Sequence, residues 1–296
     1  MNQQLMVRSR GSGALQFKLL TFLRGGTVGA TSCIKKTVYE GPQPGKLFQR
    51  WLERGGRLRA FIQSRVGHLR VTRLASCVLG FRHHRALRKI EIDITYSCNL
   101  TCPNCNRSCS QAPTAGRMTF EQVNVFVKES IAREVKWERI RLLGGEPTLH
   151  PQFSQIISLL ISYRDTFSNN TIIEVSTNGY GKKVENIIAK LPRGIIINNT
   201  HKRSDVTPNF DTLNVAPRDL QTYKRADYRS GCWIIRECGI GLSSSGYYPC
   251  AVAGGIDRIF GWDAGRQNLP NDDDNMRDLM ERFCSHCGHF NPHSPD

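Results

Sequence analysis

Short apolar runs alternate with amphipathic stretches from residue 90 to about residue 215. Ile90, Ile92 and Ile94 alternate with polar residues, which predicts a strand over 90–95. Thr119, followed by periodic apolar residues, predicts a capped helix over 119–136. The other strands expected are 139–143, 171–176, 194–198 and 212–215, and the other helices are 152–165 and 184–191. This alternation predicts an α/β fold with a parallel sheet or an incomplete barrel.

The two ends of the chain follow other patterns. The first part is rich in Gly, Ser and Thr, then two basic amphipathic helices are expected over 45–66 and 69–87. After residue 231 we expect a hairpin of strands 240–243 and 247–250, an irregular Gly/Asp-rich segment and a short helix over 276–283. The predicted parts are a flexible basic leader (1–43), a basic helical segment (44–89), the α/β domain (90–230) and a small C-terminal domain (231–296).

The net positive charge of the chain lies in its N-terminal third. The 296 residues are 39% hydrophobic, enough for a sizeable core, and no apolar run is long enough to span a membrane. Residues 1–90 hold 18 Lys and Arg against 2 Asp and Glu, whereas residues 91–296 hold 23 of each sign. Either an anionic partner or a solvated basic leader would explain this excess of positive charge. No pattern of interleaved aromatic residues and no nucleic-acid motif supports an anionic partner, so we favour the leader, expect neither nucleic acid nor membrane as partner, and expect a cytoplasmic protein.

Candidate chemistry begins with cysteine. The chain has 11 cysteines, an odd number that favours metal sites over disulfides. Cys98, Cys102 and Cys105 follow the first predicted strand, and three thiolates leave one iron of a four-iron cluster open. Gly144-Gly145-Glu146-Pro147 and Ser176-Thr177-Asn178-Gly179 follow the next two strands. Because parallel strands end at one edge of a sheet, the three motifs should converge there.

In order and spacing, these three motifs resemble those of the radical S-adenosylmethionine (SAM) enzymes, over about residues 90–215. The resemblance implies an incomplete (β/α)6-type barrel in which Cys98, Cys102 and Cys105 hold a [4Fe–4S] cluster. It also implies that SAM binds the open iron and is cleaved reductively to a 5′-deoxyadenosyl radical. Asn104 departs from the pattern, because the family usually has an aromatic residue before the third cysteine.

The resemblance also implies a set of SAM-binding residues. Gly144 and Gly145 would let the backbone approach the methionine amino group. Glu146, followed by Pro147, suits that positively charged group, either directly or by orienting the loop. Ser176 and Asn178 are placed to meet the ribose or the carboxylate. No catalytic side chain is predicted.

A second set of five cysteines lies near the C-terminus. They are Cys232, Cys238, Cys250, Cys284 and Cys287. The segment ending at Cys250 resembles the hairpin that opens the SPASM/twitch extension of radical SAM enzymes, and five cysteines fit the single-cluster twitch form. An auxiliary [4Fe–4S] cluster would take Cys250, Cys284 and Cys287 as ligands, with Cys232 and Cys238 competing for the fourth place, unless both of these bind and one of the pair Cys284 and Cys287 does not. Zinc is the rival occupant.

The resemblance implies an enzyme that abstracts hydrogen from a sugar or aminocyclitol, a nucleoside or a peptide, with an oxidative or a redox-neutral outcome. Its partners would be that substrate and a reductase such as flavodoxin or ferredoxin. The alternative is a non-catalytic zinc-binding module whose basic N-terminus contacts nucleic acid. Zinc alone would not require the glycine-rich and Ser-Thr-Asn-Gly motifs, so the enzyme is favoured.

Overall fold

The computed structural model describes residues 62, 64–204 and 215–291. The leader over 1–43 lies outside these residues, as do most of the predicted helix over 45–66 and all but the last residue of the predicted strand over 212–215. No helix of the described residues is both long and apolar enough to cross a membrane.

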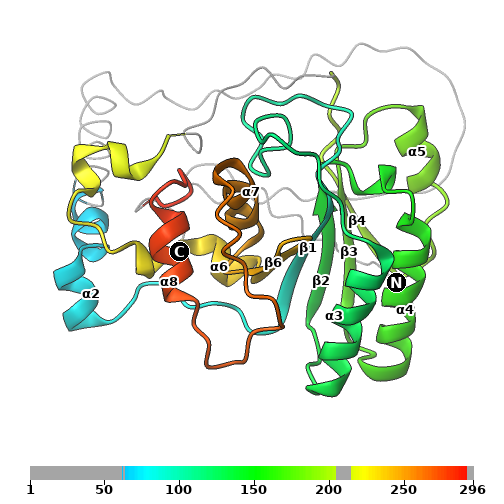
Figure 1. The fold of residues 1–296 in the computed structure, drawn as a ribbon, viewed down its shortest axis with the longest axis horizontal. Coiled ribbons are helices and arrows are strands. Elements are labelled where there is room, and N and C mark those ends of the chain that lie inside the picture. Colours follow the sequence, from blue (N-terminus) through cyan, green and yellow to red (C-terminus); the bar gives the residue numbers. More distant parts are fainter. Residues whose placement is uncertain (1–61, 63, 205–214, 292–296) are drawn as a thin grey trace, which may run out of the picture. The chain divides into compact units, whose positions relative to one another are not determined.

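A single six-stranded sheet organises the described chain (Figure 1). Its strands are β1 (Lys89–Thr95), β2 (Arg139–Gly144), β3 (Ile172–Thr177), β4 (Ile195–Asn199), β5 (Ile240–Ser243) and β6 (Gly246–Tyr248). The order across the sheet is β4-β3-β2-β1-β5-β6, and every neighbouring pair is parallel except β5 and β6. The predicted α/β class with a parallel sheet is therefore confirmed.

The two faces of the sheet differ in polarity because strand residues alternate in direction. Ile92, Leu142 and Val175 stand in register on one face and are fully buried. Helices α3 (Phe120–Ala132) and α4 (Phe153–Phe167) contribute Phe126, Ile156 and other buried side chains to the same core (Figure 1). On the opposite face the same register aligns Glu91, Arg141 and Glu174.

Local signals place the helix that follows the three-cysteine loop. The Thr119 side chain accepts a hydrogen bond from the Gln122 backbone, and the Gln122 side chain accepts one from the Thr119 backbone. This reciprocal capping box fixes the start of α3 where the sequence predicts it. A third helix on this half of the sheet, α5 (Lys182–Ile188), connects β3 to β4.

Two helix predictions are wrong. In place of a helix over 69–87, α2 (Arg73–Leu79) starts after the cap residue Thr72 and ends at Gly80, whose φ is +74°. The segment predicted to be irregular after the hairpin contains α7 (Ala251–Phe260). Gly254 and Gly255, which argued against a helix, let α7 approach Tyr248 and the Arg107 backbone closely.

The C-terminal part joins the sheet formed by the N-terminal strands. Helix α6 (Trp233–Glu237) precedes β5, which pairs in parallel with β1, and α8 (Arg277–Cys284) packs against α7. The predicted hairpin is confirmed, but it extends the first sheet beyond β1. A separate C-terminal domain from residue 231 stays a prediction.

Candidate active site

The three sequence motifs meet at the carboxyl edge of the parallel strands. The loop holding Cys98, Cys102 and Cys105 follows β1, and the other two motifs follow β2 and β3. Gly145 donates its backbone N–H to the Thr95 carbonyl at 2.7 Å, and Glu146 donates to the Ser97 carbonyl at 2.9 Å. The second motif is thus hydrogen-bonded to the segment that leads into the cysteines.

Close contacts within the chain explain why the second motif has two glycines. A Cβ on Gly144 would stand 2.0 Å from the Thr95 carbonyl oxygen, and one on Gly145 would stand 2.3 Å from that of Ser97. Gly144 also has φ +136°. Glycine is therefore required for the end of β2 to approach the end of β1. That these glycines also admit the SAM amino group stays a prediction.

Glu146 links the second and third motifs. Its side chain is 0% exposed. One carboxylate oxygen accepts hydrogen bonds from the Thr148 backbone, the Thr148 hydroxyl and the Thr177 hydroxyl, and the other accepts from the Asn178 backbone at 2.8 Å. Glu146 is predicted either to bind the amino group of SAM directly or to orient the loop. The hydrogen bonds of its carboxylate fit the second of these roles. Pro147 opens the short 3-10 turn that Glu146 caps.

The third motif reaches back to the first cysteine. The Asn178 side-chain amide donates to Asn99 Oδ1 at 2.9 Å and to Cys98 Sγ at 3.7 Å. Ser176 lies on the polar face of β3, where its hydroxyl accepts from Asn198 at 3.4 Å. Asn178 is therefore placed beside the cysteine loop, while Ser176 faces the neighbouring strand.

The cysteine loop has the chemistry that an iron–sulfur cluster needs. The side chains of Cys98, Cys102 and Cys105 are all partly exposed. Burial raises the pKa of Cys98, whereas a hydrogen bond from the neighbouring Cys109 thiol lowers the pKa of Cys105 to about 5. Three accessible thiols with an amide donor at one of them fit a cluster with one open iron.

Four of the five C-terminal cysteines gather around one cavity. Its lining includes Cys232, Cys250, Cys284 and Cys287, surrounded by aliphatic and aromatic side chains. Burial is the first cause that raises the pKa of each of these thiols. The cavity that they line has a volume of about 10 Å³, roughly the room that one water molecule needs.

Cys238 does not line this cavity. It ends α6, and its Sγ lies 3.9 Å from a terminal nitrogen of Arg141. Burial raises the pKa of Cys238 to about 12. The structure therefore brings Cys232, not Cys238, to the other three cysteines. Within the described residues no three His, Cys, Asp or Glu side chains are arranged to hold a single metal ion.

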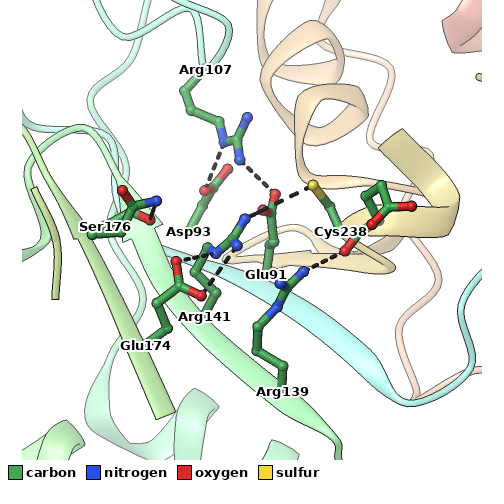
Figure 2. Close-up of polar contacts among 10 residues, drawn as sticks. Glu91, Asp93, Arg107, Arg139, Arg141, Glu174, Ser176 and Cys238 are labelled. Atoms are coloured by element: carbon green, nitrogen blue, oxygen red, sulfur yellow. Dashed lines mark hydrogen bonds and ion pairs between the residues drawn. The ribbon is translucent and has the colours of Figure 1, made fainter. Parts of the chain in front are cut away.

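A buried ionic network, which the sequence patterns did not predict, lies on the polar face of the sheet (Figure 2). Arg107, just after the cysteine loop, bonds Asp93 at 3.1 Å and Glu91 at 2.7 Å, both on β1. Arg141 of β2 joins Glu91 at 2.7 Å to Glu174 of β3 at 2.9 Å. Burial raises the pKa of Asp93 to about 6, although Arg107 opposes the rise. The alternation of charged with apolar residues in β1 was the signal available.

Comparison with known proteins agrees with the resemblance that the three motifs suggest. The family model of the radical SAM superfamily matches residues 92–198, a span that includes all three motifs. Residues 92–198 match a radical SAM domain. This family implies SAM and a [4Fe–4S] cluster as cofactors, and the three thiols of the first motif fit that cluster. The match ends before Cys232, so the twitch-like character of the C-terminal part stays a prediction.

The individual relatives match a stretch of about the same length as the family model does. A probable GTP 3′,8-cyclase of Methanocaldococcus jannaschii is 31% identical over 130 residues, covering 44% of this chain and 38% of that protein. The GTP 3′,8-cyclase of Sulfurimonas denitrificans is 28% identical over 100 residues, covering 33% and 29%. The chain thus spans well under half the length of these relatives. The structure of BtrN in complex with AdoMet and 2-DOIA aligns with 69% of this chain and 94% of that one, at 10% identity and a TM-score of 0.37.

Proposed function

We propose that this protein is a radical SAM enzyme whose catalytic cluster is held by Cys98, Cys102 and Cys105. The observation that carries the proposal is the convergence of three motifs, from three successive strands, through direct hydrogen bonds. A cysteine loop that served only as a zinc scaffold would not require the other two motifs to contact it.

The residues of the chain position the reactants. Cys98, Cys102 and Cys105 would hold the cluster, and SAM bound there would supply the radical chemistry for hydrogen abstraction from the substrate. Glu146 orients the backbone of the second and third motifs through its buried carboxylate. Asn178 fixes the cysteine loop on the side of Cys98. The glycines let the ends of β1 and β2 stay in direct contact.

We further propose an auxiliary [4Fe–4S] cluster bound by Cys232, Cys250, Cys284 and Cys287. Four thiolates complete the coordination of such a cluster. The four thiols share one cavity, yet within the described chain no three are arranged around a single ion. Zinc would draw all four sulfurs to about 2.3 Å from one point. The resemblance of the segment ending at Cys250 to the opening hairpin of a twitch extension favours the cluster over zinc, and Cys238 is not among the proposed ligands.

The substrate belongs to the classes that the family analogy supplies, namely sugars or aminocyclitols, nucleosides, and peptides. The relatives named GTP 3′,8-cyclase favour a nucleoside or nucleotide among these. Their similarity covers only a domain-sized part of each protein, so it bears on the radical chemistry more than on substrate choice. A one-electron donor such as flavodoxin or ferredoxin would reduce the first cluster.

Anaerobic reconstitution tests the proposal. Two four-iron clusters predict a brown protein with about eight irons per chain, which cleaves SAM to 5′-deoxyadenosine and methionine on reduction with dithionite. Replacing Cys98, Cys102 and Cys105 together by alanine should halve the iron and abolish cleavage. The matched control Cys77→Ala changes an exposed thiol outside both sets and should alter neither. A colourless zinc protein that leaves SAM intact would refute the proposal.

A further inference from the structure

Asn178 makes a tight turn just after β3. Its Oδ1 accepts a hydrogen bond from the Tyr180 backbone N–H at 2.7 Å, which is the contact of an Asx turn. Because a backbone N–H can only donate, it fixes which end of the side-chain amide faces it. The other end, Nδ2, is thereby directed at the cysteine loop, where it lies 2.9 Å from Asn99 Oδ1 and 3.7 Å from Cys98 Sγ.

A closed ring of hydrogen bonds holds this amide in place. Asn99 Nδ2 donates to the Tyr180 carbonyl at 2.7 Å, the Tyr180 N–H donates to Asn178, and Asn178 donates to Asn99. Each of the two side-chain amides accepts with its oxygen and donates with its nitrogen, so neither can turn over without losing both bonds. Asn178 is also only 8% exposed, so water competes little for its N–H groups. The direction of Nδ2 toward Cys98 is therefore built into the fold.

Two N–H groups point at the Cys98 sulfur. One is the Leu100 backbone N–H, 3.4 Å from Sγ, and the other is the Asn178 amide at 3.7 Å. A thiolate bound to iron carries negative charge, and N–H groups bond more strongly to charged acceptors than to neutral ones. Reduction adds an electron to the cluster, so such donors stabilise the reduced state more than the oxidised state. Hydrogen bonds to the sulfurs are accordingly among the factors that set the potentials of iron–sulfur clusters.

We infer that Asn178 is a positioning residue for the first cluster, whose amide donates an N–H···S hydrogen bond to the Cys98 thiolate and thereby raises the reduction potential of the cluster. The inference rests on the proposed function, because it requires a cluster at the first motif. It differs from the SAM contact predicted for Asn178, since it needs no contact between this side chain and SAM. A higher potential makes one-electron reduction easier, so the third motif assists the step that precedes SAM cleavage.

Redox titration followed by electron paramagnetic resonance tests this inference in the reconstituted full chain without SAM, so that SAM binding does not contribute. The variant that lacks all three cysteines of the first motif shows which signal belongs to the first cluster. Asn178→Ser keeps an oxygen that can accept from the Tyr180 backbone but loses the amide N–H. It should lower the midpoint potential by about 30 mV, roughly a threefold change in the ratio of reduced to oxidised cluster. Asn178→Asp keeps the shape and the turn but turns a negative oxygen toward the sulfur, so its potential should fall by about 59 mV or more, a tenfold change.

Asn99→Ala is the matched control. It removes two bonds of the same ring, those with the Tyr180 carbonyl and with Asn178, but leaves the Tyr180 N–H that directs the Asn178 amide. Asn99 is exposed, so this variant should fold, and its first cluster should keep the wild-type potential.

Three results would overturn the inference. The first is a wild-type potential in Asn178→Ser. The second is an equal fall in Asn99→Ala, which would show that the ring and not the donor to sulfur matters. The third is failure of both Asn178 variants to hold the first cluster, which would make the residue structural; if only Asn178→Asp fails, Asn178→Ser decides. A wild-type protein without a cluster at the first motif would instead refute the proposed function itself, and its colour and iron count reveal this before any Asn178 variant is made.

Discussion

At the scale of single residues, Glu146 explains how two loops from different strands come to act together. Its carboxylate accepts four hydrogen bonds from Thr148, Thr177 and Asn178, and all four donors lie at the ends of β2 and β3. A glutamine of the same shape would turn an –NH₂ group toward one of these donors. The geometry therefore requires an acceptor at both positions.

We predict that Glu146→Gln lowers the free energy of unfolding by about 2–3 kcal/mol, because a hydrogen bond to a charged group is lost and a buried donor is left unpaired. Chemical denaturation of the apo-protein measures the change. SAM cleavage in the reconstituted variant should fall at least tenfold, because the third motif loses its anchor. Glu185→Gln, an exposed position on α5, is the control and should stay within 0.5 kcal/mol of wild type. A wild-type stability for Glu146→Gln would contradict the role given to this carboxylate.

Some residues could be predicted and others could not. Spacing alone singled out Cys98, Cys102 and Cys105, because their chemistry is local in sequence. Glu91 and Asp93 were visible as the polar half of an alternating strand, but their partner Arg107 comes from the following loop, and only the fold brings the three together. Likewise, Cys232 precedes α6 and Cys238 follows it, so the choice between them depends on which end of the helix lies at the cavity. The sequence does not show this.

At the scale of elements, the close approach of β1 and β2 is what the Gly-Gly pair makes possible. We predict that Gly145→Ala lowers the free energy of unfolding by about 1–3 kcal/mol, since its methyl group would overlap the Ser97 carbonyl. The shift this forces on the cysteine loop should reduce SAM cleavage by about a hundredfold, because small displacements of reacting groups are costly. Cleavage assays and thermal unfolding measure the two effects.

Gly116→Ala is the matched control for this substitution. Its new methyl group would meet the Ser244 hydroxyl at 3.5 Å, an ordinary contact, so stability and SAM cleavage should both stay near wild type. Equal losses in the two variants would show that glycine flexibility in general, and not the contact of Gly145 with Ser97, is what matters here.

The elements themselves were predicted unevenly. Strands β1 to β3 and helices α3 and α4 follow from periodicity, because each has one apolar face and one polar face. Strand β4 follows instead from a run of three isoleucines. The pairing of β5 with β1 joins segments about 150 residues apart, and neither sequence indicates which strand it pairs with. Helix α7 was missed because Gly254 and Gly255 lower helix propensity, while the packing that compensates for them is tertiary.

At the scale of the whole molecule, the two sets of cysteines lie near neighbouring strands of one sheet. The first set follows the end of β1, and the four cavity cysteines lie at or just beyond the ends of α6, α7 and α8. Helix α7 packs against β5, the strand next to β1. The ionic network connects β1, β2 and β3 with the cysteine loop, and Cys238 contacts its member Arg141. The proposed function implies a division of labour, in which the first set serves SAM cleavage and the second serves later steps.

The pair Cys232→Ser and Cys238→Ser tests this division. Cys232 lines the four-cysteine cavity, so its loss should lower the iron from about eight to about four per chain and remove the auxiliary cluster signal. Cys238 contacts Arg141 instead, so its serine variant should keep about eight irons. Both should still cleave SAM at near wild-type rates, because neither belongs to the three-cysteine motif. Iron analysis and a 5′-deoxyadenosine assay give the two readouts. If Cys238→Ser loses the irons and Cys232→Ser keeps them, the ligand set is wrong. If Cys232→Ser folds normally but no longer cleaves SAM, the two cluster sites depend on each other and the division of labour fails.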